Sequence, residues 1–154
     1  MKFAGPLKSM TREFLAAAGV PAGDIERMVE GDLKEAPIAA LGSITPRRIM
    51  ETIGTDWGRK TITEGLWTDV AEARIRALMA DGKSVVVDDM RFPNEFDLIE
   101  RMGGRTVRIE RRGRTPTAME GRLNGHFFDY YVTNDGTRQE FRDVVDHLVT
   151  RLRA

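Results

Sequence analysis

Short apolar runs alternate along the chain with longer stretches of helical periodicity. Residues 85–87 are three successive valines without polar alternation, which is typical of a strand buried on both faces of a parallel sheet. Residues 106–110 do alternate, with Val107 and Ile109 on one face, and predict a shorter strand. Residues 127–133 predict a further strand, and residues 1–4 have the pattern of a strand's last residues.

The first predicted helix begins at Gly5 and Pro6 and presents Leu7, Met10 and Phe14 on one face. The glycine at position 19 and the proline at position 21 end it. From residue 24 to residue 40 the pattern is irregular and charged, which indicates helix fragments and a loop.

Two further helices have clear first residues. Thr45 followed by Pro46 combines an N-cap with a proline at the first helical position. Thr68 or Asp69 is expected to cap the next helix, and Gly82 lies past its end. The positions of that helix expected to face inward are Val70, Ala73, Ala77 and Leu78.

A helix beginning at Pro93 is expected to end at residues 103–104, where two glycines follow each other. The last helix has the clearest amphipathic pattern, because its apolar residues recur on one face with charges opposite. These residues are Phe141, Val144, Val145, Leu148, Val149 and Leu152. Strands that alternate with helices predict a three-layer α/β domain.

Residues 84–95 read as a strand, a short polar turn and a helix, and they hold the first candidate chemistry. Ligands of open α/β sheets bind outside the carboxyl ends of the strands, which is where Asp88, Asp89 and Arg91 would lie. A carboxylate beside a guanidinium suits a phosphate or a Mg²⁺-phosphate ligand. The alternative is a helix N-cap with a solvated ion pair.

Composition narrows the class of protein. The 154 residues suit one domain, and Lys and Arg balance Asp and Glu at 24 each, which argues mildly against nucleic acid and membrane partners. The chain has no cysteine, and His126 and His147 are too far apart to suggest a metal site. Nothing resembles a signal peptide or a membrane span, so we expect a cytoplasmic protein.

Arginines and tryptophans are the remaining candidates for ligand binding. The arginines form clusters near expected loops and helix ends, as a converging phosphate clamp would require, although arginine is also common on surfaces: Arg47, Arg48, Arg59, Arg91, Arg111, Arg112 and Arg114. Trp57, between two glycines, is the better candidate for stacking on a base, whereas Trp67 fits a structural role better. His126, beside two phenylalanines, fits a packed or capping residue.

An ordered set of short motifs covers nearly the whole chain. They are FAGPLK at 3–8, KEAP at 34–37, GTDWGR at 54–59 with Trp67, DMRFPNE at 89–95, the glycines at 103–104 with IER at 109–111, and DYYVTNDG at 129–136. In this order and spacing the set resembles the deoxynucleoside monophosphate kinases of bacteriophages and prophages, a branch of the P-loop kinase fold. The resemblance implies a three-layer parallel sheet with helices on both faces.

The same resemblance implies roles for individual residues. Catalytic roles at the acceptor phosphate and in a lid would fall to Asp89, Arg91, Arg111, Arg112 and Arg114. Substrate contacts would come from Lys8, Arg47, Glu51, Trp57, Arg59, Trp67, Asn94 and Glu95. Asn134 would lie near the base of the ATP donor, and Asp88 and Asp89 would hold Mg²⁺ through the phosphates. Residues of about 20–82 would form the acceptor-binding helical region, and residues of about 111–126 the basic lid.

Two features depart from the family pattern. Glu51 stands where a Gln is expected, and a carboxylate cannot donate a hydrogen bond, which leaves room for a different base preference. Family members also begin with a central strand and a phosphate-cradling loop, but the 154 residues contain no G-x-x-x-x-G-K-[ST] motif. We therefore expect impaired catalysis by this chain alone, and residues 85–87 without a neighbouring strand.

Three explanations of the second departure stay open: a natural chain that starts upstream, direct pairing of the remaining strands, or a strand supplied by another chain in a homodimer or hetero-assembly. The first functional hypothesis is transfer of a phosphoryl group from ATP to a deoxynucleoside monophosphate. The alternative is a non-catalytic nucleotide-binding or protein-interaction module of the same ancestry. A third hypothesis, nucleic acid binding through the arginine loops, has less support than the other two because the positive and negative charges of the chain balance.

Overall fold

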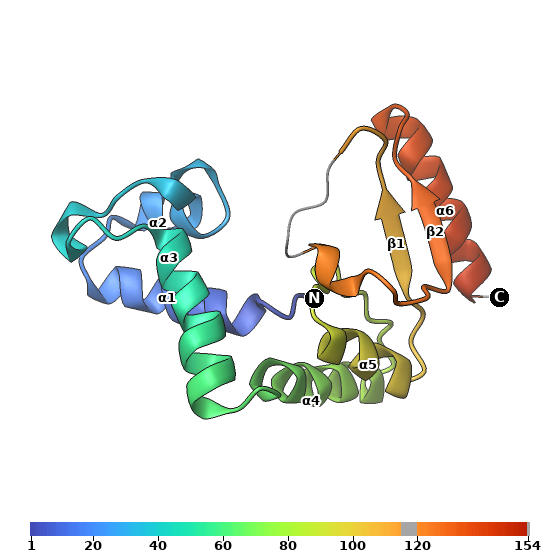
Figure 1. The fold of residues 1–154 in the computed structure, drawn as a ribbon, viewed down its shortest axis with the longest axis horizontal. Coiled ribbons are helices and arrows are strands. Elements are labelled where there is room, and N and C mark those ends of the chain that lie inside the picture. The colour runs from blue at the N-terminus through green and yellow to red at the C-terminus, as the bar shows by residue number, and fades with distance from the viewer. Residues whose placement is uncertain (115–119, 154) are drawn as a thin grey trace. The chain divides into compact units, whose positions relative to one another are not determined.

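The computed structural model describes residues 1–114 and 120–153, and the chain divides into two compact units, Met1–Met90 and Arg91–Ala154 (Figure 1). The first unit is helical. Its elements are α1 (Gly5–Ala17), α2 (Ala22–Val29), the 3₁₀ turns η1 (Asp32–Glu35) and η2 (Ala39–Leu41), α3 (Pro46–Glu51), the π-helix η3 (Thr52–Ile62) and α4 (Leu66–Ala80). The second unit contains α5 (Pro93–Arg101), β1 (Val107–Glu110), the 3₁₀ turn η4 (Glu120–Leu123), β2 (Tyr130–Thr133) and α6 (Arg138–Arg153).

The core of the first unit lies where α1, α2 and α3 meet, and is built from Leu15, Val29, Ile38 and Ile49. The face predicted for α1 is therefore wrong at two positions. Met10 and Phe14 are 41% and 46% exposed, whereas Thr11 and Leu15 are completely buried. The burial of Thr11 is tolerated because its hydroxyl donates to the Leu7 carbonyl at 2.8 Å.

Helix α4 differs from its prediction in both start and buried face. It begins at Leu66 with Gly65 as its N-cap, earlier than the expected cap at Thr68 or Asp69. Its buried residues are Trp67, Thr68, Ala71 and Ile75, whereas Ala73 and Ala77 are exposed. The large indole of Trp67 determines which side turns inward, because burying it removes more apolar surface from water than burying alanines does.

The valine run of residues 85–87 does not form the predicted buried strand, and residues 1–4 form none either. Val86 is 72% exposed. A strand needs a neighbouring backbone as a ladder partner, and in the first unit this segment has only isolated polar contacts with the beginning of the chain. One of them is a hydrogen bond from the amino group of Met1 to the Val86 carbonyl.

The second unit contains a parallel pair of strands, as predicted, although β2 is shorter than residues 127–133. Val107 lies opposite Tyr130 and Glu110 opposite Thr133. The described residues thus form a mixed, helix-rich α/β structure with a two-stranded parallel sheet, and the predicted three-layer arrangement stays a prediction. The helix α6 follows β2 and agrees with the prediction from its periodicity.

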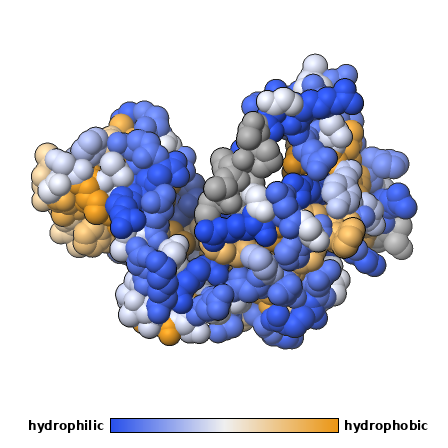
Figure 2. Space-filling view, in the orientation of Figure 1, coloured by the Kyte–Doolittle hydropathy of each residue, from blue (hydrophilic) through white to orange (hydrophobic). Residues whose placement is uncertain are grey.

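Large hydrophobic side chains are exposed in both units, and Figure 2 shows their patches among the hydrophilic surface. Phe14 and Val86 belong to the first unit, and Phe127, which is 89% exposed, belongs to the second. Within the described residues, no helix is both long and apolar enough to cross a membrane.

Candidate functional site

The GTDWGR motif of residues 54–59 lies in the π-helix η3, which continues directly from α3. The wider turn is visible in the hydrogen bond from the amide of Thr63 to the carbonyl of Gly58, five residues back, at 3.1 Å. π-Helical turns are rare in proteins, and those that occur often lie at functional sites. The sequence analysis did not predict this element, because a π-helix has no periodicity that separates it from an α-helix over so few residues.

Trp67 explains both glycines of the motif. Its indole Nε1 donates to the Gly54 carbonyl at 2.8 Å, and the side chain is 4% exposed. A Cβ at position 58 would lie 2.7 Å from atoms of the Trp67 ring, so Gly58 provides the space that the ring occupies. These contacts give Trp67 a packing role in the first unit, in line with the structural role favoured by the sequence.

Trp57 and Arg59 lie on the same π-helix but are not buried with Trp67. The Trp57 side chain is 40% exposed, and its ring centroid lies 6.4 Å from that of Trp67. Arg59 donates from Nη1 to the Glu64 carbonyl at 3.4 Å. The segment therefore presents an exposed aromatic face and a guanidinium from one rigid support, which suits a ligand with a planar base and a phosphate.

Carboxylates accompany the other cations near this segment. Lys60 donates to Asp56 at 2.8 Å, and this hydrogen bond lowers the pKa of Asp56. Arg47, at the first turn of α3, forms an ion pair with Glu35. Glu51, the last residue of α3, is exposed.

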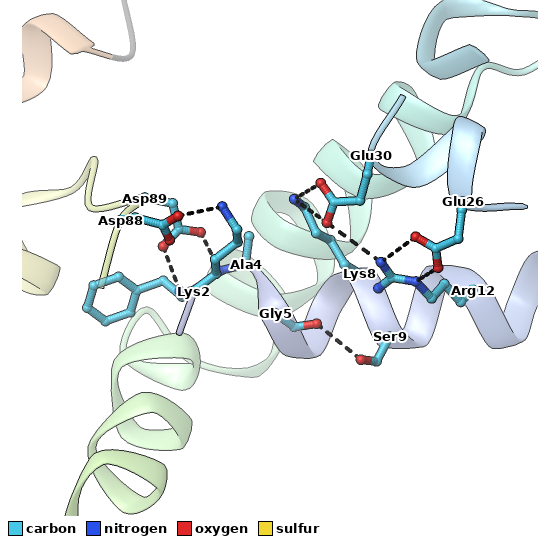
Figure 3. Close-up of polar contacts among 11 residues, drawn as sticks. Lys2, Ala4, Gly5, Lys8, Ser9, Arg12, Glu26, Glu30, Asp88 and Asp89 are labelled. Atoms are coloured by element: carbon cyan, nitrogen blue, oxygen red, sulfur yellow. Dashed lines mark hydrogen bonds and ion pairs between the residues drawn. The ribbon is translucent and has the colours of Figure 1, made fainter. Parts of the chain in front are cut away.

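Carboxylates contact the first residues of the chain and the beginning of α1 (Figure 3). Lys8 donates from Nζ to both carboxylate oxygens of Glu30, at 2.9 and 2.7 Å. Both oxygens of Asp89 accept backbone amides, from Phe3 at 2.7 Å and Ala4 at 3.0 Å. Asp89 therefore acts on the residues that lead into α1, where a negative charge complements the helix dipole.

Asp88 is paired with Lys2 at 2.9 Å, and both side chains are largely exposed. The hydrogen bond from Lys2 lowers the pKa of Asp88, and the same bond raises the pKa of Lys2. The alternative reading of this stretch, a cap with a solvated ion pair, thus describes the contacts that Asp88 and Asp89 make. Among residues 1–114 and 120–153, no group of three or more His, Asp or Glu side chains gathers as a metal site would require.

In the second unit, Glu95 works as a helix cap. Its Oε2 accepts the amides of Arg91 at 2.8 Å and Phe92 at 3.1 Å, and the residue is 3% exposed. The Arg91 side chain is exposed, and Asn94 is half-buried in the first turn of α5. Pro93 at the first helical position agrees with the predicted start of this helix.

The parallel pairing of β1 and β2 brings two predicted groups to one edge of the sheet. The amide of Arg112, after β1, donates to Asp135, after β2, at 2.6 Å, and Arg112 Nε lies 3.2 Å from the same carboxylate. The amide of Asn134 donates to the Glu110 carbonyl at 2.7 Å. Arg111 and Arg114 are exposed nearby in sequence, and the predicted lid continues into residues 115–119, which lie outside the described residues.

Several polar residues that the sequence analysis did not single out belong to this framework. Glu30, Glu26 and Arg12 form an ion-pair network with Lys8, and the spacing of four residues on each helix was the available signal. His126 packs edge-on against Phe96 with ring centroids 4.8 Å apart, as expected for a packed histidine. Its Nδ1 is buried and has no hydrogen-bond partner among the described residues.

The comparisons with known proteins agree with the motifs. The family model described as deoxynucleotide monophosphate kinase matches residues 21–145. A putative deoxynucleotide monophosphate kinase of Acanthamoeba polyphaga mimivirus is 30% identical over 153 residues, which covers 90% of this chain and 76% of the relative.

A second relative, the deoxynucleoside-5′-monophosphate kinase of Escherichia phage T5, is 36% identical over 56 residues, which covers 36% of this chain and 22% of the phage protein. No solved structure matches the chain. The family match spans most of both units, and the mimivirus relative aligns along most of its own length. The chain therefore belongs to the deoxynucleotide monophosphate kinase family.

Proposed function

We propose that the protein transfers the γ-phosphoryl group of ATP to the 5′-phosphate of a deoxynucleoside monophosphate, and that this chain carries the acceptor side of the site. The observation that carries the proposal is the family match over residues 21–145. The π-helical segment adds physical support, because it presents an exposed Trp57 and, two residues later, the guanidinium of Arg59.

In the proposed reaction an oxygen of the acceptor phosphate attacks the γ-phosphorus of ATP. The bond from that phosphorus to the β–γ bridging oxygen breaks, and ADP leaves with the electron pair. Phosphoryl transfer needs little covalent help from a protein, so catalysis consists of positioning and of stabilising charge on the transferring group.

The acceptor nucleotide is assigned to the first unit. Trp57 would stack on the base, and Arg59 would bind the nucleotide through a fixed fork of donors. Arg47 and Glu51, on α3 just before the π-helix, would contact the same nucleotide. Trp67 would contribute by holding the π-helix in shape, which is a positioning role.

Phosphate contacts are assigned to charged residues of each unit separately. In the first unit, Lys8 and Asp89 would serve the acceptor phosphate. In the second unit, Arg91 would bind phosphate, with Asn94 and Glu95 shaping the first turn of α5. Asn134 would lie near the donor base. The charge on the transferring group would be neutralised by Arg111, Arg112 and Arg114.

A Mg²⁺ ion is implied by the family and fits one of the two proposed ligands better. The Asp88 side chain is 58% exposed and accepts the Lys2 ammonium at Oδ2, whereas both oxygens of Asp89 already accept backbone amides. Mg²⁺ commonly binds through one or two carboxylates together with substrate phosphates, and when bound it neutralises phosphate charge. Asp88 would hold the ion, and Asp89 would orient the backbone beside it.

Calorimetry and a coupled kinase assay test the proposal together. The 154-residue protein is titrated with each deoxynucleoside monophosphate and with the matching nucleosides, and turnover is measured with ATP and Mg²⁺. Binding of a monophosphate with slow turnover is the expected result, because the 154 residues contain no phosphate-cradling motif. Binding without turnover would restrict this chain to the alternative role of a nucleotide-binding module, and no binding of any monophosphate would contradict the proposal.

A matched pair of variants tests the acceptor assignment. Arg59→Ala should weaken monophosphate binding about tenfold or more, because a charge-assisted contact to phosphate is lost. Arg76→Ala removes the same charge from α4, where Arg76 pairs with Glu72 at 2.6 Å, and should leave affinity unchanged. Equal affinities of the two variants would contradict the role of Arg59.

A further inference from the structure

Helices α1 and α2 face each other with a ladder of opposite charges. Lys8 and Arg12 are four residues apart on α1, and Glu26 of α2 lies four residues before Glu30, the residue that follows α2 (Figure 3). Lys8 pairs with Glu30 at 2.7 Å, and Arg12 pairs with Glu26 at 2.5 and 3.1 Å. Arg12 Nη2 also lies 3.6 Å from Glu30, so the two pairs are linked.

Lys8 has an unusual position for a cation that serves only helix stability. It lies in the first turns of α1, where the positive end of the helix dipole opposes a positive charge and where no acidic residue is present. Its side chain is 16% exposed, against 41% for Glu30. A largely covered ammonium is thus held at the wrong end of a helix by a more exposed carboxylate.

Carboxylates also hold the other anion-binding groups of this part of the first unit. Asp89 accepts the amides of Phe3 and Ala4 just before α1, and Glu30 accepts both hydrogen bonds from Lys8. Backbone amides before a helix and a lysine ammonium are donors that a phosphate uses. The carboxylates therefore stand in positions that a phosphate's oxygens could take.

We propose that Glu30 is an affinity-determining residue of the acceptor site: its carboxylate is paired with the Lys8 ammonium until a doubly charged phosphate monoester displaces it. This inference rests on the function proposed above. A singly charged anion or an uncharged nucleoside gains too little from Lys8 to replace a bidentate carboxylate, whereas a phosphate dianion offers twice the charge. Glu30 thereby lowers the affinity of the site for any ligand that must take Lys8 from it, and a phosphate dianion has the charge to displace it.

Other cations lie near the Glu30 carboxylate and would still interact with it after a phosphate had displaced it from Lys8. Arg12 lies 3.6 Å from Glu30 before any exchange, and Lys34 adds a positive charge that acts on the same carboxylate. Burial raises the pKa of Glu30, but the hydrogen bond from Lys8 and the charges of Lys8, Lys34 and Arg12 outweigh it, so the pKa is lowered and the carboxylate is ionised at neutral pH. After exchange Glu30 keeps cationic neighbours, so it is not left unpaired beside the phosphate.

Calorimetric titration of Glu30→Gln and Glu26→Gln with a deoxynucleoside 5′-monophosphate tests the inference. Each variant removes one negative charge from the ion-pair network, but only Glu30→Gln frees Lys8. The monophosphate should bind up to about fivefold more tightly to Glu30→Gln, which corresponds to the free energy of a half-exposed ion pair. Its affinity for Glu26→Gln should not change. The affinity for the matching uncharged nucleoside, which cannot use the Lys8 ammonium, should stay unchanged in both variants.

The double variant Lys8→Ala/Glu30→Gln distinguishes this effect from a change in helix packing. The gain in affinity should disappear, because it depends on the freed ammonium. Thermal unfolding of each variant checks that the fold is retained. Unchanged or weaker binding by Glu30→Gln, or an equal gain in Glu26→Gln, would overturn the inference while wild-type binding still supports the proposed function. No monophosphate binding by either the wild type or Glu30→Gln would contradict both.

Discussion

The π-helix η3 and the segment of residues 84–90 are both rich in candidate chemistry, yet they are supported in different ways. In η3, the buried Trp67 fills the space at Gly58 and donates to Gly54, so the motif is positioned by packing inside the first unit. Residues 84–90 have no strand pairing, and polar contacts from Asp88 and Asp89 to the beginning of the chain hold them. Packing supports the first region, and a few electrostatic contacts support the second.

The difference teaches that a short motif acquires a fixed geometry from its neighbours and not from its own residues. A ring buried against glycines permits only one arrangement of the surrounding backbone, because protein interiors are close-packed and tolerate little change in volume. Exposed carboxylate contacts are weaker and depend on pH and salt. The following variants test whether the two regions differ in stability as this comparison requires.

The largest effect is expected for Trp67→Ala, which removes a side chain that is 4% exposed and leaves the Gly54 carbonyl without its indole donor. Loss of a buried Trp should lower the free energy of unfolding by about 3–5 kcal/mol. Chemical denaturation measures this change. Trp57→Ala, at a position 40% exposed, should cost less than about 1 kcal/mol, and equal costs for the two variants would contradict the packing role of Trp67.

Gly58→Ala tests the same contact by adding one methyl group. Its Cβ would lie 2.7 Å from the Trp67 ring, and overpacking of this kind should lower the free energy of unfolding by about 1–3 kcal/mol. Gly23→Ala in α2 is the matched control, because nothing lies within 4 Å of its added Cβ. That variant should be neutral or stabilising by up to about 1 kcal/mol, and a similar loss in both would show that Trp67 moves aside easily.

Asp89→Ala tests the second region. It leaves the amides of Phe3 and Ala4 without their carboxylate, which should lower the free energy of unfolding by about 1–2 kcal/mol. Asp88→Ala removes the neighbouring carboxylate and its exposed pair with Lys2, so its cost should not exceed about 1 kcal/mol. A larger loss in Asp88→Ala than in Asp89→Ala would reverse the roles assigned to the two residues.

The smallest effect is a pH dependence of the Lys2–Asp88 pair. Because Lys2 lowers the pKa of Asp88, the pair's contribution is present above the unfolded-state pKa of about 4 and is lost as pH falls through the lowered folded-state pKa. The difference in unfolding free energy between wild type and Asp88→Asn should be about a few tenths of a kcal/mol at pH 6 and vanish near pH 2. A difference that persists in acid would mean that Asp88 stabilises by another contact.

Local signals predicted several element boundaries well. Thr45 caps α3 through its side chain, with Pro46 at the first helical position, and Gly82 follows α4 in a left-handed conformation. Such boundaries depend on hydrogen bonds and backbone preferences within a few residues, so they can be predicted from the local sequence. Two strands of a parallel sheet were also predicted from apolar patterns near residues 107–110 and 130–133, but only the structure shows that they pair with each other.

Features that depend on distant partners were predicted less well. The buried face of α1 shifted from Met10 and Phe14 to Thr11 and Leu15, because several faces of that helix are apolar and α2 and α3 select one. The candidate cations were found by type and motif, but their carboxylate partners were not, since Glu30 and Asp135 lie far from Lys8 and Arg112 in sequence.

The sequence by itself determined the family, through motifs in a fixed order, together with the starts of α1, α3 and α5 and the presence of two strands near residues 107–110 and 130–133. Only the tertiary structure decided that the GTDWGR motif is π-helical around Trp67, that residues 85–87 form no strand in the described chain, and that Glu30 holds Lys8. The physical reason is range: caps and turns are settled by neighbouring residues, whereas burial, ladder pairing and ion pairs depend on which distant groups the folded chain brings into contact.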